Sequence, residues 1–366
     1  MAWMTGAAPL GRIALMVATI LFGTAMTMQG DGRPDPGELR RAYAGAPAEW
    51  PRPTLRPGAD FAEFAPLPTL PAPDARTTAL ARIGARLFDD PRLSRSGQIA
   101  CASCHARELG FGDGVRTAFG HDRQRGTRNT PGLYTVAWQH QFFWDGRAAT
   151  LEAQALGPLT SPIEMAADLG SVARRINRDA DYRRDFAAVN GRRRVTTADI
   201  VAALAAFERG LRPPPSRYAR FVGGDARALD DQQLWGLHLF RTKAGCANCH
   251  SGPLLSDQKF HNLGLSFYGR AREDLGRYAV THAAADVGRF RTPSLLGVRA
   301  TGPYMHNGLI PTLEGVVALY DSGGGRDRAS RARASDAPPP TPDPLLAPLS
   351  LTRDERAALV AFLQAL

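Results

Sequence analysis

Apolar residues recur along much of the chain at intervals of three and four, the spacing that places them on one face of a helix. Four segments show this pattern most clearly: 78–88, 198–209, 231–241 and the last dozen residues. The apolar residues that carry it are Leu80, Ile83 and Leu87; Ile200, Leu204 and Phe207; Leu234, Leu237 and Phe240; and Leu359, Phe362, Leu363 and Leu366. Sustained alternation of apolar and polar residues, the pattern of a strand, does not occur. The chain is therefore expected to be mainly α, a fold of helix and loop.

Two of these helices have residues before them that favour a helix start, and one of the two is followed by prolines that stop it. Thr196 with Asp199, and Thr352 with Glu355, have the spacing of a capping box at a helix N-terminus. Pro213–Pro215 follows the 198–209 segment and prevents the helix from continuing. This break is a candidate boundary between domains.

The chain has 366 residues, of which 44% are apolar, so two domains with a core each are expected. We assign them to 77–220 and 221–366. The net charge of +10 is carried mostly by arginine, and a basic surface favours an acidic electron donor or an anionic membrane. The arginines are scattered and no groove-reading motif occurs, so nucleic acid is not an expected partner.

Residues 1–30 have the pattern of an export segment. A single charged residue, Arg12, precedes an apolar run from Ile13 to Met28. The 16-residue run is slightly short for a membrane span, and no clean cleavage site follows it. A cleaved signal peptide, an uncleaved membrane anchor and a buried helix all fit. Either of the first two places the protein in the periplasm, and the anchor would associate it with the membrane.

Two further segments are rich in residues that disfavour regular structure. Proline dominates 31–76, and we expect an extended arm without helix in which Trp50, Phe61 and Phe64 pack on a domain. A mobile linker is the alternative. The segment Gly323–Pro344 is rich in Gly, Arg, Ser and Pro, which predicts a solvated surface loop.

The motif Cys-x-x-Cys-His occurs once in each half of the chain and uses all four cysteines, so no disulfide is expected. Its residues are Cys101, Cys104 and His105, and Cys246, Cys249 and His250. In a c-type haem site the two thiols form thioethers with the porphyrin vinyl groups, and the histidine binds the iron. Paired zinc or redox sites are the alternative. The motif predicts two covalent haem c groups in two cytochrome c-like domains, with His105 and His250 as iron ligands.

Other motifs, in order and spacing, make the chain resemble the bacterial di-haem cytochrome c peroxidase and MauG superfamily over about 77–366. These motifs are His121 with Gly126-Thr127-Arg128-Asn129, Phe143-Trp144-Asp145-Gly146-Arg147-Ala148, Gln154-Ala155-Leu156-Gly157-Pro158, Glu164-Met165, Gly288-Arg289-Phe290-Arg291-Thr292-Pro293-Ser294-Leu295 and Thr301-Gly302-Pro303-Tyr304-Met305-His306-Asn307-Gly308. The resemblance implies an enzyme rather than a plain electron carrier.

The resemblance gives Glu164 the role of acid–base above the first haem, with Gln154 as its polar neighbour. Cleavage of peroxide requires such a group, which accepts a proton and returns it to the departing oxygen. From the residues alone, a surface carboxylate on the loop after Pro162 is the favoured interpretation of Glu164. Trp144 resembles the family's tryptophan between the haems, although a bare tryptophan is more often a core residue.

The remaining positions do not all match one branch of the superfamily. His121 matches the peroxidase histidine that caps the first haem and leaves on reduction, and a loop histidine is the alternative. Tyr320 falls at the position of the sixth ligand of the second haem, which is a methionine in peroxidases and a tyrosine in MauG. If Tyr320 is a packed core residue instead, Met305 is the alternative ligand. MauG has a tryptophan at the position of Ala244. His306 matches the neighbour of a haem propionate.

The resemblance also implies a calcium ion held by Asn129, Thr301 and Pro303, since oxygen ligands suit that cation. We expect a peroxidase that reduces hydrogen peroxide, with electrons from a cytochrome c, a copper protein or a quinol entering at the second haem. The resemblance allows a homodimer, and the sequence leaves the oligomeric state open. The alternatives are a MauG-like oxidase of a partner protein and a di-haem electron carrier.

Overall fold

The computed structural model describes residue 29 and residues 32–327 and 336–366. The export segment expected over 1–30 lies outside the described residues, apart from Gln29. Within the part of the chain that is described, no helix has the length and apolar character needed to cross a membrane.

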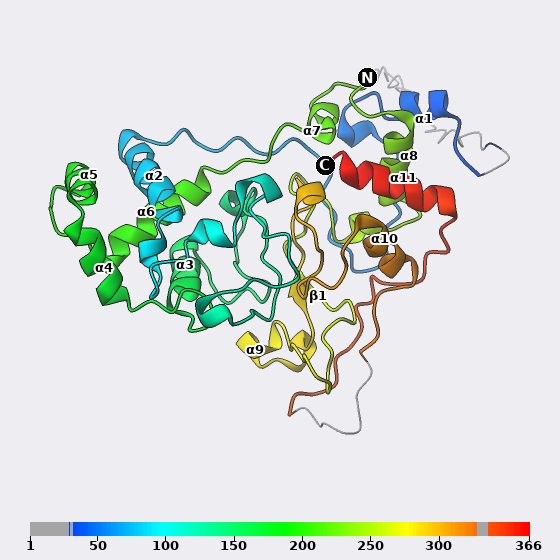
Figure 1. Cartoon of the computed structure of the whole chain (residues 1–366). Helices are drawn as coiled ribbons and strands as arrows, with labels where there is room; N and C mark the ends of the chain where they lie inside the picture. The colour runs from blue at the N-terminus through cyan, green and yellow to red at the C-terminus, as the bar shows by residue number, and fades with distance from the viewer. Residues whose placement is uncertain (1–28, 30–31, 328–335) are drawn as a thin grey trace, which may run out of the picture.

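The described chain is mainly helix and loop, which confirms the predicted fold class (Figure 1). The α-helices are α1 Pro36–Ala42, α2 Ala75–Phe88, α3 Leu151–Thr160, α4 Leu169–Arg178, α5 Ala180–Asn190, α6 Thr197–Arg209, α7 Arg217–Val222, α8 Asp231–Arg241, α9 Tyr278–Thr281, α10 Leu313–Asp321 and α11 Arg353–Gln364. Short 3-10 turns lie at Pro47–Glu49, Pro91–Leu93, Cys101–Ser103, Arg107–Leu109, His121–Arg123, Val136–Trp138, Cys246–Asn248, Ala284–Asp286 and Val298–Ala300. Two-residue strands, β1 Phe260–His261 and β2 Phe290–Arg291, pair antiparallel.

The four helices predicted from apolar spacing all form, and their ends follow their caps. Both predicted capping boxes are present, at the starts of α6 and α11. Helix α8 has the predicted bounds. Helix α2 begins at Ala75, three residues before the predicted start, because the Asp74 carboxylate accepts a hydrogen bond from the Thr77 N–H and caps the first turn.

Each half of the molecule is built on one crossing of two helices. Helix α2 packs against α6 in the first half, and α8 packs against α11 in the second (Figure 1). A glycine permits each close approach: a Cβ on Gly84 would lie 1.9 Å from the Ala203 carbonyl oxygen, and one on Gly236 would lie 2.0 Å from that of Ala358. The two halves therefore share one packing plan.

The two hydrophobic cores divide before residue 220. The first core extends from α2 to α6, whereas Tyr218 and Phe221 of α7 are buried in the second core. We therefore propose Pro213–Pro215 as the domain boundary, in place of the expected residue 220.

The proline-rich arm contains a helix, so the expectation that it cannot be helical was wrong at this point. Helix α1 starts at Pro36, where a missing N–H costs nothing, and the Asp35 carboxylate caps it. The rest of the arm is mostly extended and is not a free linker. Trp50 and Phe64 are buried in the second core and Phe61 packs against it, as the aromatic residues predicted.

The arm runs along the second haem motif and is bonded to it. The Arg56 N–H donates to Asn248 Oδ1 at 2.7 Å, inside the motif. Just after the motif, the Gly252 N–H donates to the Ala62 carbonyl at 2.9 Å, and the Ala62 N–H donates to Ser251 Oγ at 3.3 Å. The arm thereby belongs structurally to the second domain.

The segment Gly323–Pro344 is not a wholly solvated loop, in contrast to the expectation. Its residues 328–335 lie outside the described part of the chain. On either side, the Gly325 N–H donates to the Leu263 carbonyl at 2.8 Å, and Ala337 and Asp343 are buried. Gly, Ser and Pro in a sequence do not distinguish a free loop from one that packs on a domain.

Candidate functional site

The first motif and its surroundings form a cavity of about 1010 Å³, here called the first cavity, lined by Cys101, Cys104 and His105. The motif folds as a single tight turn. The N–H groups of Cys104 and His105 both donate to the Cys101 carbonyl, at 3.1 and 2.9 Å. This turn presents both sulfurs and the imidazole to one cavity, as haem attachment requires.

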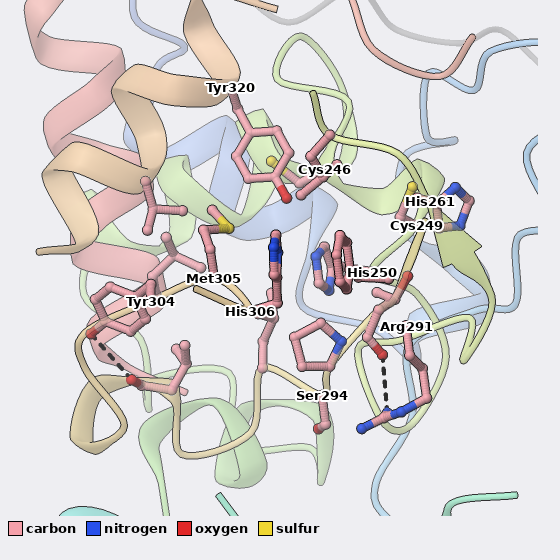
Figure 2. A pocket seen from close by; sticks show the side chains of 18 of the residues that line it. Cys246, Cys249, His250, His261, Arg291, Ser294, Tyr304, Met305, His306 and Tyr320 are labelled. Atoms are coloured by element: carbon pink, nitrogen blue, oxygen red, sulfur yellow. Dashed lines mark hydrogen bonds between the residues drawn. The ribbon is translucent and has the colours of Figure 1, made fainter. Parts of the chain in front are cut away.

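The second motif folds in the same way and lines the second cavity (Figure 2). The N–H groups of Cys249 and His250 donate to the Cys246 carbonyl, at 3.2 and 2.9 Å. Met305, His306 and Tyr320 line the same cavity.

Both motif histidines are oriented as iron ligands. The Nδ1 atom of His105 lies 2.7 Å from the Phe111 carbonyl, and that of His250 lies 2.9 Å from the Leu255 carbonyl. A carbonyl only accepts, so Nδ1 carries the proton and Nε2 is free to bind a metal. Burial lowers the pKa of both histidines, which favours the neutral form that a ligand needs. These residues fit a haem in each cavity.

A zinc or redox role for the cysteines fits less well. The two motifs line separate cavities and cannot combine into one four-sulfur site. Burial raises the pKa of Cys101 to about 12 and that of Cys104 to about 11, whereas redox and zinc-binding thiols have lowered values. Among the described residues, Cys249 groups with Asp257 and His261, but the imidazole of His261 is already bonded at both nitrogens, to Asp257 and Asp343.

Glu164 and Gln154 are brought together on the wall of the first cavity. Gln154 projects from α3, and Glu164 follows in the turn after that helix, where its N–H donates to the Ser161 carbonyl at 3.1 Å. The Glu164 side chain is open to the cavity, yet neighbouring atoms exclude enough water to raise its pKa. A hydrogen bond from Ser161 and the charge of Arg147 oppose that rise.

His121 does not line the first cavity. Its imidazole lies beside Asp122, with 3.5 Å between Nε2 and the carboxylate. Its backbone is fixed to the Glu164 turn, because the His121 N–H donates to the Glu164 carbonyl at 2.7 Å. The preceding Gly120 lies so close that a Cβ there would be 2.2 Å from the Ile163 carbonyl oxygen.

Trp144 lines both cavities. Its indole N–H donates to the Asn129 carbonyl at 2.9 Å, and its own carbonyl accepts from the Arg291 N–H at 2.8 Å. The ring meets His306 edge to face, with the centroids 6.5 Å apart. Both ends of the tryptophan are therefore fixed between the two cavities.

His306 also lines both cavities and stacks on Phe290, with the ring centroids 3.5 Å apart. Burial lowers its pKa to about 3, so the imidazole is neutral. Its carbonyl accepts from the Asn129 N–H at 2.7 Å, which joins the two halves of the chain beside Trp144.

Met305 and Tyr320 both point into the second cavity, as Figure 2 shows. Tyr320 comes from α10, and burial raises the pKa of its phenol. Met305 comes from a loop in which it has a φ of 70°, a conformation uncommon for a residue with a side chain. The cavity therefore contains both candidate sixth ligands.

The residues assigned to calcium also come together. Asn129, Thr301 and Pro303 all line the second cavity. The side-chain amide of Asn129 donates to the carbonyls of Val115 and Arg116 at 3.2 and 3.4 Å, which leaves its oxygen available as a ligand.

Several residues of the first cavity were not singled out from the sequence. Arg128 bonds to Asp145 at 2.6 Å and to Asp274 at 2.7 Å, and so joins the two halves. Arg147 covers the Phe143 ring at 3.4 Å. Both arginines lie inside the motifs that carry the family resemblance. Their place in those motifs is the feature of the sequence that could have marked them as site residues.

Glu208 is a second buried carboxyl of the first cavity, and burial raises its pKa to about 8. It lies within the apolar helix α6, so no sequence signal marked it.

The repeated motif turns, with an oriented histidine in each half, define a di-haem c-type redox protein. A family model described as di-haem cytochrome c peroxidase matches residues 78–227, and one described as RoxA-like, cytochrome c-like, matches 289–321.

Relatives that align over most of their length extend this match. The chain is 34% identical over 334 residues to the cytochrome-c peroxidase IdrP1 of Pseudomonas sp. (strain SCT), covering 83% of this chain and 85% of the relative. It is 37% identical over 303 residues to the methylamine utilization protein MauG of Methylorubrum extorquens, covering 81% of each. A solved MauG-like protein associated with microbial copper homeostasis is 34% identical, with a TM-score of 0.72 over 84% of this chain and 94% of that one. The chain belongs to the di-haem cytochrome c peroxidase and MauG family, and it is a peroxidase-type oxidoreductase.

Proposed function

We propose that the protein reduces hydrogen peroxide to water in the first cavity, with electrons that enter through the second. The observation that carries this proposal is the asymmetry of the cavities. The first has an available carboxyl, Glu164, on its wall. Among the described residues that line the second cavity, Asp343 has the one carboxyl group. That carboxyl group is already hydrogen-bonded to Nδ1 of His261.

Haem held by His105, Cys101 and Cys104 would supply the site where peroxide binds and the electrons that cleave its O–O bond. Glu164 would accept a proton from peroxide and return it to the departing oxygen. Gln154 holds peroxide by a hydrogen bond. Trp144 lies between the two cavities and provides the route for electrons.

In the second cavity we propose His250 and Tyr320 as the ligands of haem, with Met305 as the alternative to Tyr320. We propose His306 as the neighbour of a haem propionate. We also propose a calcium ion at Asn129, Thr301 and Pro303, where it would join the two halves.

We propose further that the protein works in the periplasm, because residues 1–30 have the pattern of an export segment. Its basic charge suits an acidic electron donor, which is a cytochrome c, a copper protein or a quinol. The proposed assembly is a homodimer.

A MauG-like oxidase that uses peroxide to oxidise a partner protein is the second candidate. The observation that favours it is Tyr320 in the second cavity, the residue type that MauG has at this position. The position of His121 outside the first cavity also agrees with a site that is open from the start. Rapid peroxide turnover with reduced cytochrome c or a quinol favours the peroxidase. A long-lived doubly oxidised state that accepts no small donor favours the oxidase.

The variant Glu164→Gln tests the proposed function. An amide cannot take the proton, so we expect kcat for peroxide to fall by about 10²–10⁴-fold, the usual contribution of acid–base catalysis. Steady-state turnover with a reduced donor measures it. The matched control is Glu152→Gln, whose carboxylate binds Arg209 at 2.7 Å outside the first cavity. Equal activity of Glu164→Gln and the wild type would contradict the proposal.

The pH profile gives a second measurement on the same residue. Glu164 acts as a base only when ionised, and burial raises its pKa above that of an ordinary glutamate. Turnover should therefore fall as the pH drops through this raised pKa. The acid limb should disappear in Glu164→Gln and persist in Glu152→Gln.

A further inference from the structure

An unbroken series of packed aromatic rings leads from the second haem motif into the arm. It runs from His250 through Phe240, Phe64 and Trp50 to Tyr43, and successive ring centroids are 5.2 to 6.5 Å apart. Four of these residues are buried in the second core, and His250 is the ligand at the start of the series. The arm supplies the last three rings, where it packs on α8 (Figure 1).

Tyr43, at the end of this series, has a candidate proton acceptor. Its hydroxyl oxygen lies 3.0 Å from Nδ1 of His238, and only 1% of its surface is exposed. In the tautomer with the proton on Nε2, Nδ1 accepts the hydrogen bond from the hydroxyl. Burial lowers the pKa of His238 to about 4, so the imidazole is neutral and able to take a proton. A buried phenol loses an electron readily only when its proton leaves at the same time, because the cation that would otherwise form is a very strong acid.

Trp50, the preceding ring, lacks such a base. Its indole N–H donates to the Gly45 carbonyl at 2.9 Å, and a carbonyl does not take up the proton. Oxidised Trp50 would therefore remain a cation, with the buried guanidinium of Arg241 5.4 Å from its ring. Oxidised Tyr43 becomes a neutral radical once His238 holds its proton, and the positive charge then lies on His238, whose pKa Arg241 also lowers.

We propose that Tyr43 and His238 form a redox-active pair that takes oxidising equivalents from the second haem. The inference rests on the proposed function, since hydrogen peroxide is the oxidant. Tyr43 loses one electron to the peroxide-oxidised haem pair, which is reduced by one electron. The O–H bond breaks, its proton binds to Nδ1 of His238, and a neutral tyrosyl radical remains beside an imidazolium. When no electron donor is bound, the Tyr43–His238 pair holds one oxidising equivalent away from the haem.

The chain contains a matched control for this pair. Tyr218 is also 1% exposed and packs against Phe64, with the ring centroids 6.3 Å apart. Its hydroxyl, however, has no hydrogen-bond partner among the described residues. Tyr43 and Tyr218 thus differ mainly in the presence of a base.

The test uses the full-length holoenzyme mixed with one equivalent of hydrogen peroxide, without donor, and frozen within milliseconds. Electron paramagnetic resonance should show a tyrosyl radical whose lines narrow when tyrosine is ring-deuterated. The signal should be lost in Tyr43→Phe and in His238→Phe, and kept in Tyr218→Phe. Persistence of the same signal in Tyr43→Phe, or its absence in wild type whose haems are oxidised by peroxide, would overturn the inference.

Turnover with a reduced donor, measured on the same samples, distinguishes failure of the inference from failure of the proposed function. Tyr43→Phe should consume peroxide at the wild-type rate, because the hydroxyl lies outside both cavities. Wild type that turns over peroxide but forms no tyrosyl radical overturns only the pair. Wild type that does not react with peroxide overturns the proposed function and the inference with it.

Discussion

At the scale of single residues, two candidate haem ligands, the sulfur of Met305 and the oxygen of Tyr320, line the second cavity. As iron ligands they would have opposite effects on the haem. A thioether raises the reduction potential, whereas a phenolate favours oxidised iron. Burial raises the pKa of Tyr320, so binding must be strong enough to remove its proton.

We predict that Tyr320→Phe changes the absorption and magnetic resonance spectra of the second haem and raises its reduction potential. Met305→Leu should leave both unchanged, and it is the control because it keeps the volume of the side chain. Redox titration of each variant, followed at the second haem, makes the measurement. The reverse pattern, with Met305→Leu altered and Tyr320→Phe unaltered, would assign the ligand to Met305.

Residues whose role depends on a short motif were the predictable ones. The sequence spacing Cys-x-x-Cys-His requires the turn that puts Cys101, Cys104 and His105 on one cavity. The carbonyl that orients His105 could not be predicted, because Phe111 contributes only a backbone atom. Glu208 and the Tyr43–His238 pair were missed for a related reason: their neighbours are distant in sequence and become close only on folding.

At the scale of elements, the turn that carries Glu164 is held by the loop that carries His121. The contact is tight, since only a glycine at position 120 fits against the carbonyl of Ile163. A hydrogen bond of 2.7 Å between the His121 N–H and the Glu164 carbonyl completes it. This contact couples the position of the His121 loop to that of the turn that carries Glu164.

We predict that Gly120→Ala lowers peroxide turnover while both haems stay attached. The added methyl forces the two loops apart, and a displacement of about 1 Å can cost about 10²-fold in rate. Overpacking of this kind destabilises a protein by about 1–3 kcal/mol. Steady-state kinetics and thermal unfolding measure the two effects.

Gly126→Ala is the control for this prediction. It lies in the same loop, and its Cβ would have no neighbour closer than 3.8 Å. Equal turnover in the two alanine variants would show that the contact between the loops does not position Glu164.

Helix positions were predictable, but the ends and the arm were less so. Apolar spacing located α2, α6, α8 and α11, because each buries one face against a partner helix. Proline content led to the wrong expectation for α1, because it does not show which proline occupies the first turn, where it is tolerated. The distance between the His121 loop and the Glu164 turn could not be predicted, because it depends on the contact of Gly120 with the Ile163 carbonyl.

At the scale of the whole molecule, Trp144 is one of the residues that line both cavities. It is fixed by Asn129 at the indole N–H and by Arg291 at the backbone. Beside it, the bonds of Arg128 to Asp145 and Asp274 connect the two halves. The shared packing plan of the halves was predictable from the repeated motif, but this junction was not, because it combines residues from four separate segments.

We predict that Trp144→Phe slows electron transfer from the second haem to the first. The phenyl ring is harder to oxidise, and loss of the indole leaves the Asn129 carbonyl without its donor, which costs about 1–3 kcal/mol. Stopped-flow spectroscopy after rapid reduction of the second haem measures the rate.

Trp138→Phe is the control, since Trp138 donates to the Pro68 carbonyl and lines neither haem cavity. An unchanged rate in Trp144→Phe would mean that electrons cross by another path.

The bonds between the arm and the second haem motif make the N-terminal arm part of the C-terminal half. Arg56 and Ala62 bond to Asn248, Ser251 and Gly252. Arg56 and Asn248 are 192 residues apart in the sequence, so the second half is complete only when both ends of this long stretch have come together.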